Sequence, residues 1–390
     1  MKKILTLSSN AFLWINPKEG IIYNSNIHKA FEFTMTEAIY DICEKLLNID
    51  NLYSVEYDDD EASVRRFIDG IESINAGKSH LEDTHFLSLP PVLNLQHSIE
   101  MQSRRDYDFQ DFALRHLTKV KIYTGGKCVD NIFYKQIDYP INSEKILNSK
   151  DIINWIKAIR SQYLTEVSLC FSDISEFVGL YELLEFLSGF KFNVIIYVRA
   201  DDNYAIIREI CRNYPRVSIN VLYHPGDEKI SSNLIQYNVK HTFLISSEAQ
   251  YYTIERLSNQ YNDVQIETVP IFNGKNYDFF KRSVFLSKED ILSSQWDKKD
   301  IFMHQVLNVN NFGILYLMPN KKIYSDINQP ELGSICDSIY DLIIKELSCN
   351  YSWRWIRNND SCQKCLYRYL CPSPTSYESV MNIKCICTNL

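Results

Sequence analysis

The sequence predicts an α/β protein whose central part is a partial barrel of six β/α units. Between residues 110 and 275, short apolar stretches alternate with amphipathic helical patterns. This alternation is typical of a parallel sheet with right-handed crossovers. Six units are too few for a closed eight-stranded barrel, so the sheet is expected to stay open. Different patterns precede and follow this stretch, so we expect three domains in the 390 residues, at 1–82, 83–300 and 301–390.

The first domain is expected to begin with strands. Residues 12–15 and 20–23 are apolar and flank the turn sequence Asn-Pro-Lys-Glu, which predicts a β-hairpin. Residues 29–34 alternate between polar and apolar side chains and predict a third strand. The polar stretch 77–83 is expected to be the linker to the second domain.

Two helices are expected after these strands. Thr36 is the predicted cap of the first, and acidic residues 58–61 favour the start of the second. Apolar residues recur at helical spacing in both. These are Ile39, Ile42, Cys43, Leu46 and Leu47 in the first helix, and Val64, Phe67, Ile68 and Ile71 in the second.

The central domain contains six candidate strands with helical patterns between them. The strands are expected at residues 120–124, 166–171, 192–198, 217–222, 241–245 and 264–271. The helices are expected at residues 152–159, 177–187, 204–212 and 252–259.

The third domain has a different pattern. Residues 312–318 and 323–324 flank Pro-Asn-Lys-Lys and predict a second hairpin. A helix is expected at 334–347, and a cysteine-rich segment follows it.

Cysteine spacing near the C-terminus predicts a metal centre. Cys362, Cys365 and Cys371 form a C-x2-C-x5-C motif, and Cys385 and Cys387 follow. Two thiolates with two residues between them on a turn can bind one metal ion or two corners of an iron–sulfur cluster. Spacing alone does not separate zinc from iron–sulfur.

Composition restricts the compartment and the partners. A net charge of −8 gives no general electrostatic support for a nucleic-acid partner. No apolar run of 18 residues exists, so we expect no membrane association and a cytoplasmic protein. The 11 cysteines are then expected to be reduced, which favours metal ligation over disulfides. Cys43, Cys170 and Cys211 have apolar neighbours and are expected to be buried thiols.

The C-terminal motif resembles a known domain. Trp353-Arg354-Trp355-Ile356-Arg357, the cysteine motif with Leu-Tyr-Arg-Tyr-Leu-Cys-Pro, and Tyr377-Glu378 look like a SPASM domain. Such domains extend radical SAM peptide-modifying enzymes and hold auxiliary [4Fe–4S] clusters. The resemblance implies one [4Fe–4S] cluster, with zinc as the alternative. Its ligands would be Cys362, Cys365, Cys371 and Cys387, although Cys385 could substitute for Cys387.

The second domain departs from the radical SAM pattern. Tyr123-Thr124-Gly125-Gly126-Lys127-Cys128 resembles the approach to the C-x3-C-x2-C motif, but Ile132 and Lys135 occupy the next two cysteine positions. No glycine pair follows Cys170, where the family has a Gly-Gly-Glu motif. The chain therefore resembles pseudo-radical-SAM/SPASM proteins of Gly-Gly-leader, ATP-grasp-associated peptide maturation systems. This implies a radical-SAM-like partial barrel whose cluster site is degenerate at Cys128, and no bound S-adenosylmethionine.

The first domain resembles a RiPP recognition element, a winged-helix-like module that binds the leader of a ribosomally made precursor peptide. The resemblance implies that the leader adds a strand along the edge at 29–34, beside the helix that carries Val64 to Ile71. The residues expected to bind it are Lys29, Phe31, Phe33, Val64, Phe67, Ile68 and Ile71. It also implies a partner enzyme, either a radical SAM/SPASM enzyme or an ATP-grasp ligase.

Three functions stay open. The first is a non-catalytic accessory protein that binds the leader. The second is an active radical SAM enzyme whose unusual ligand set includes Cys128, Cys170 and another cysteine. The third is an electron-transfer module for a partner enzyme.

Overall fold

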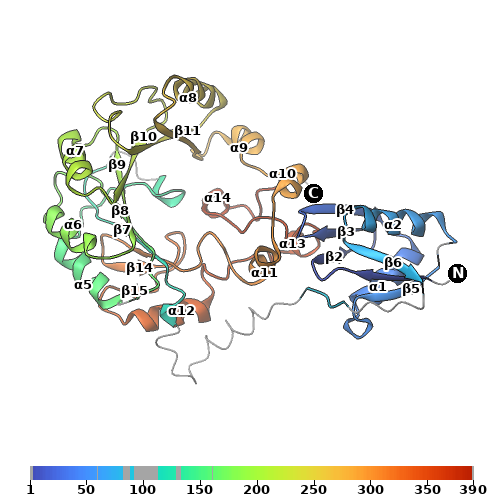
Figure 1. Cartoon of the computed structure of the whole chain (residues 1–390). Coiled ribbons are helices and arrows are strands. Elements are labelled where there is room, and N and C mark those ends of the chain that lie inside the picture. Colours follow the sequence, from blue (N-terminus) through green and yellow to red (C-terminus); the bar gives the residue numbers. More distant parts are fainter. Residues whose placement is uncertain are drawn as a thin grey trace.

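The computed structural model shows a curved sheet with helices on its outer side and a smaller module beside it (Figure 1). The structure describes residues 3–58, 60–81, 88–91, 113–128, 133–159 and 161–388. Ile132, one of the two positions that replace radical SAM cysteines, lies outside these residues.

The predicted hairpin, third strand and two helices of the N-terminal module are confirmed. Thr36 caps the first helix, because its hydroxyl accepts a hydrogen bond from the Ile39 backbone N–H. The sheet has the order β2-β3-β4, so β4 is an edge strand. The elements are β2 (Ala11–Ile15), β3 (Glu19–Asn24), β4 (Lys29–Thr34), α1 (Glu37–Leu47) and α2 (Ala62–Ser73).

A second three-stranded sheet in this module was not predicted. Its order is β5-β1-β6, and it consists of β1 (Lys3–Leu7), β5 (Ser54–Tyr57) and β6 (Gly77–Leu81). The prediction of a linker is therefore wrong at Gly77–Leu81, since this segment pairs antiparallel with β1. Its polar sequence suits an edge strand, which needs only backbone pairing and one covered face. A short 3-10 helix, Ile49–Asn51, precedes β5.

The six predicted strands of the central part form consecutive parallel neighbours. Pairing runs from β7 through β8, β9, β10 and β11 to β12, with every adjacent pair parallel. Strands that follow one another in chain order and run in the same direction form the wall of a barrel. The sheet stays open, because its edge strands β12 and β15 (Gly333–Ser334) do not pair with each other. The strands are β7 (Lys119–Tyr123), β8 (Glu166–Cys170), β9 (Asn193–Arg199), β10 (Val217–Tyr223), β11 (Val239–Ile245) and β12 (Gln265–Pro270).

Four helices cover the outer face of this sheet (Figure 1). They confirm the predicted helical patterns, with α5 and α8 beginning three and four residues earlier than expected and α6 three residues later. Their bounds are α5 (Ser149–Ile159), α6 (Leu180–Ser188), α7 (Tyr204–Asn213) and α8 (Glu248–Gln260).

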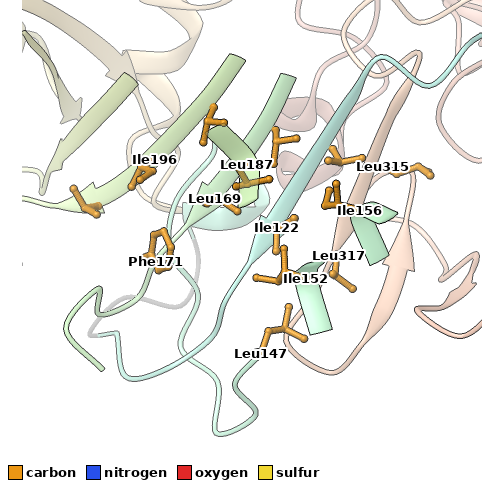
Figure 2. Close-up of a cluster of buried hydrophobic side chains, with 14 of the residues drawn as sticks. Ile122, Leu147, Ile152, Ile156, Leu169, Phe171, Leu187, Ile196, Leu315 and Leu317 are labelled. Atoms are coloured by element: carbon orange, nitrogen blue, oxygen red, sulfur yellow. The ribbon is translucent and has the colours of Figure 1, made fainter. Parts of the chain in front are cut away.

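The main hydrophobic core lies between the sheet and these helices. Figure 2 shows Ile122, Leu169 and Ile196 from neighbouring strands together with helical side chains. Ile152 and Leu187 are fully buried members of the same cluster. Burial of this many aliphatic side chains stabilises the barrel wall, at about 25 cal/mol per Å² of apolar surface.

The predicted second hairpin extends the same sheet. β13 (Ile314–Leu317) pairs parallel with β7, and β14 (Lys322–Tyr324) and β15 (Gly333–Ser334) follow on its far side. The first strand of the predicted third domain, β13, therefore belongs to the same sheet as the strands of the predicted second domain. The helix α12 (Ile339–Cys349) starts five residues later than expected, because residues 333–334 pair with β14.

Short helices complete the C-terminal part. Three of them, α10, α11 and α14, begin with capping boxes at Ser287, Asp297 and Thr375. The remaining elements are the 3-10 helix Phe133–Lys135, α9 (Tyr277–Ser283), α10 (Lys288–Ser293), α11 (Lys298–Val306), α13 (Asp360–Gln363) and α14 (Ser376–Met381). Within the described ranges, every helix is too short or too polar to cross a membrane.

Candidate functional site

The turn that carries Cys362 and Cys365 is fixed by Asn359. The Asn359 side-chain oxygen caps α13 by accepting from the Cys362 backbone N–H at 3.0 Å. Its amide nitrogen donates to Cys362 Sγ at 3.2 Å and to the Lys384 carbonyl at 3.0 Å. One side chain therefore connects the first cysteine of the motif to the segment that carries Cys385 and Cys387.

The other cysteines are held by backbone hydrogen bonds. The Cys371 N–H donates to the Tyr367 carbonyl at 2.8 Å, which turns the chain back after Cys365. The C-terminal segment lies along Leu286, which donates to the Ile386 carbonyl at 2.8 Å and accepts from Thr388 at 3.0 Å. Cys385 Sγ and Cys387 Sγ are 3.4 Å apart.

The thiols interact electrostatically with one another. Burial raises the pKa of Cys371 to about 12, against the lowering effect of Arg357, and Cys362 and Cys365 add to the rise. Burial also raises the pKa of Cys387 to about 12, with contributions from Cys385, Cys371 and Cys362. Mutual repulsion among thiolates is typical of side chains that share a small volume. Metal binding would replace the thiol protons and relieve that repulsion.

Arg357 supplies the positive charge at this centre. Its side chain is buried, Nη1 donates to Glu378 Oε1 at 2.7 Å, and Nε donates to the Pro372 carbonyl at 2.5 Å. Its Nη2 is buried without a hydrogen-bond partner among the described residues. The guanidinium also interacts with Cys362 and Cys371, opposing the rise in their pKa. A buried donor left unpaired beside thiols fits an anionic cluster, whose sulfurs accept hydrogen bonds.

Coordination geometry itself is not present. In the part of the chain that the structure describes, no three His, Cys, Asp or Glu side chains are arranged to hold a metal ion. The ligand set Cys362, Cys365, Cys371 and Cys387 therefore remains a prediction. The surroundings of Arg357 fit the group, and the thiols are close enough to interact.

Cys128 stands in a different environment, beyond the carboxyl end of β7. It is buried in an apolar cluster with Phe133 and Leu222, and its Sγ accepts from Arg199 Nη1 at 3.5 Å. Cys170, at the end of β8, is fully buried in another cluster with Tyr123. The structure thus assigns the two thiols of the alternative ligand set to separate clusters.

The expected leader-binding residues divide into two groups. Lys29 is exposed and Phe31 is half-buried on the edge strand β4. Phe33 and the residues Val64, Phe67, Ile68 and Ile71 of α2 are buried in the core of the module. The Phe33 and Phe67 rings are 4.6 Å apart, and the Phe31 ring lies against Gly70, where no Cβ would fit. These buried residues hold α2 against β4; their contact with a leader stays a prediction.

Packing of the N-terminal module against the cysteine segment was not predicted from the sequence. Phe12, Ile21 and Tyr23 of its sheet share a buried cluster with Leu366, Tyr367, Leu370 and Cys371. The Tyr23 hydroxyl donates to the Trp296 carbonyl at 3.0 Å. Non-local docking of this kind has no short sequence pattern.

One residue of the edge strand bonds directly to the cysteine segment. Glu32, on β4, accepts from the Tyr367 hydroxyl at 2.5 Å and pairs with Lys288 at 2.5 Å. Tyr367 lies between Cys365 and Cys371 in the chain. The edge strand and the cysteine segment are therefore in contact through one hydrogen-bonded carboxylate.

Comparisons with known proteins give distant structural similarities. No family model and no curated protein matches the chain. Among solved structures, SuiB of Streptococcus suis bound to S-adenosylmethionine is 11% identical, with 99% of each chain covered and a TM-score of 0.47. SuiB bound to its precursor peptide SuiA is 12% identical over 94% of each chain, with a TM-score of 0.42. The structure of anSMEcpe with AdoMet and the Cp18Cys peptide is 12% identical, covering 68% of this chain and 96% of that one, with a TM-score of 0.42. Similarities at this level do not assign an activity to this chain.

Proposed function

We propose that this chain is an accessory protein of ribosomal peptide maturation that binds a precursor leader and carries one [4Fe–4S] cluster. The observation that carries the proposal is the interaction of buried Arg357 with the thiols of Cys362, Cys365 and Cys371. The segment that carries these thiols contacts the edge strand β4, because the Tyr367 hydroxyl donates to Glu32. The resemblance of residues 353–387 to a SPASM domain supports the cluster. Cys128, beyond the end of β7, provides one thiol only, and it is in contact with Arg199 at the end of β9.

The cluster would be held by Cys362, Cys365, Cys371 and Cys387. When bound, such a group supplies one-electron transfer or a structural cross-link. The protein's own contribution is to hold the ligand turns through Asn359 and to place the Arg357 donor beside the sulfurs. Hydrogen bonds to cluster sulfurs tune the reduction potential.

Leader binding would use the free edge of β4. An edge strand offers unpaired backbone groups to an added strand, and side-chain contacts then select the peptide. Lys29 and Phe31 are the expected residues of β4 that keep some exposure. The partner would be a radical SAM/SPASM enzyme or an ATP-grasp ligase of the same system.

Titration calorimetry with synthetic leader peptides of neighbouring precursor genes tests this part. We expect micromolar binding that Lys29→Glu weakens, whereas Lys18→Glu in the β2–β3 turn has the same charge change and no effect. Lys18 is exposed and lies outside β4, so it is a matched control. Absence of binding at high micromolar peptide would contradict leader recognition.

An electron-transfer role is the second candidate. It is favoured by Cys365, Cys385 and Cys387, which are only partly buried and so lie near the surface. Incubation with S-adenosylmethionine and a reductant distinguishes the accessory and electron-transfer roles from radical SAM catalysis. Formation of 5′-deoxyadenosine would show an active radical SAM enzyme and overturn the accessory function.

A further inference from the structure

A cavity of about 400 Å³ lies on the inner side of the curved sheet. Its wall consists of side chains from β7 and from β9 to β13, and residues of the segments 134–138, 326–327 and 375–377 also line it. The volume is at the lower end of the range for small-molecule sites. Much of the lining is polar or charged.

Both lysines of the lining are already neutralised. Lys121 Nζ contacts both carboxylate oxygens of Asp138, at 2.8 and 2.9 Å. Lys240 Nζ is 2.6 Å from Glu267. Each of these ion pairs satisfies its own charge, so neither lysine is left to balance another anion in the cavity.

Asp326 is the third acid of the lining and has no such partner. Its side chain is 3% exposed, and Oδ1 accepts from the Asn328 backbone N–H at 2.8 Å. Among the residues that the structure describes, Oδ2 has no hydrogen-bond partner and Asp326 forms no ion pair. Burial raises the pKa of Asp326 above its ordinary value, as expected for a carboxyl group without a cation. Burying the Asp326 carboxylate costs free energy unless a donor from outside the protein forms a hydrogen bond with Oδ2.

The lining also has an unpaired donor and aromatic surface. Asn311 is 6% exposed and its Nδ2 has no hydrogen-bond partner among the residues described. Tyr134 and Tyr197 line the same cavity. Tyrosine rings attract cations, so these rings and Asp326 both favour a positively charged ligand.

We propose that this cavity binds a small ligand in which an ammonium group lies next to a carbonyl oxygen. The ammonium group donates to Asp326 Oδ2, and the carbonyl oxygen accepts from Asn311 Nδ2. Because Asp326 Oδ2 and Asn311 Nδ2 are both covered in the ligand-free chain, docking involves a small rotation of each side chain. The ligand is a free amino-acid derivative or the N-terminal residue of a short peptide, since both share this chemistry. The proposal does not depend on leader binding or on the cluster.

Calorimetric titration of the full chain tests it with three probes. We expect alaninamide to bind, and N-acetylalaninamide, which lacks the charge, to bind at least about tenfold more weakly. Trialanine distinguishes the sources: its binding shows that a peptide N-terminus is accepted, and its failure beside bound alaninamide points to a free amino-acid derivative.

The variant Asp326→Asn separates ligand recognition from a structural role. We expect at least about tenfold weaker alaninamide binding and an unchanged or higher thermal midpoint without ligand, because a buried unpaired charge is removed. Asp41→Asn is the control, since Asp41 is an exposed residue of α1. Equal binding of the acetylated probe, unchanged affinity in Asp326→Asn, or a lowered midpoint of that variant would each overturn the proposal.

Discussion

The cysteine at the end of β7 and the cysteines near the C-terminus lie in different surroundings. Cys128 is a single thiol in an apolar cluster with one guanidinium contact, from Arg199. At the C-terminus, several thiols interact with one another and with buried Arg357, whose Nη2 has no hydrogen-bond partner among the described residues. A cluster needs several thiolates and stabilising donors together, so the comparison favours metal chemistry at the second region and not at the first.

The largest expected effect is on iron content. Cys362→Ser should lose nearly all iron, because a ligand of the only proposed cluster is removed. Cys128→Ser is the control and should retain it. Iron and sulfide analysis of both variants checks this. Equal loss of iron in the two variants would contradict the proposal that the cluster is bound at the C-terminal cysteines and not at Cys128.

Arg357→Met is expected to destabilise the fold by about 3–5 kcal/mol, because it leaves Glu378 buried without its partner. Urea unfolding measures the change. The control Lys45→Met breaks the exposed pair with Asp41, which should cost less than about 0.5 kcal/mol. A small effect of Arg357→Met would mean that the charge of this centre is not needed for the fold.

Acid should weaken the barrel independently of the cysteines. Burial lowers the pKa of His241, on β11, to about 4. The unfolded chain then binds the extra proton between pH 6.5 and 4, so the stabilising effect of neutral His241 is present above pH 6.5 and lost as the pH falls toward 4. Between pH 7 and 4.5 the loss from this residue is about 2–3 kcal/mol. Urea unfolding at both pH values checks it.

The variant His241→Gln should remove most of this acid sensitivity. His224→Gln, at an exposed position, is the control and should leave it unchanged. If the stability of His241→Gln falls between pH 7 and 4.5 as much as that of the parent, the acid sensitivity arises from other residues.

The smallest expected effect concerns the contact between the module and the cysteine segment. Tyr367→Phe removes the hydrogen bond to Glu32 and should cost about 1 kcal/mol while retaining iron. Chemical unfolding and iron analysis measure the two quantities. Loss of iron in this variant would show that the docked module helps to form the centre.

The barrel strands could be predicted because short, largely apolar segments recur between amphipathic helical patterns, which is the spacing of β/α units, although their inner faces carry polar residues such as Lys121 and Thr242. β6 was missed because Gly77–Leu81 is polar and its pairing depends on the distant strand β1. The helix α12 was placed too early because apolar periodicity does not reveal the pairing of residues 333–334 with β14.

The candidate site could be predicted only in part. Spacing identified the cysteines, since ligand turns leave a local pattern. The burial of Arg357 and the Glu32–Tyr367 hydrogen bond depend on segments that meet only in the fold. The five buried residues expected to contact a leader have the apolar periodicity of a core helix and strand, which does not distinguish a groove from an interior.

The most direct test of the account is the iron, sulfide and zinc content of anaerobically purified protein, together with its visible spectrum. We expect about four irons and four sulfides per chain, which corresponds to one cluster at the C-terminal cysteines. About eight irons would mean that a second cluster exists, and one zinc without iron would reduce the C-terminal cysteines to a structural site. Either of these results would contradict it.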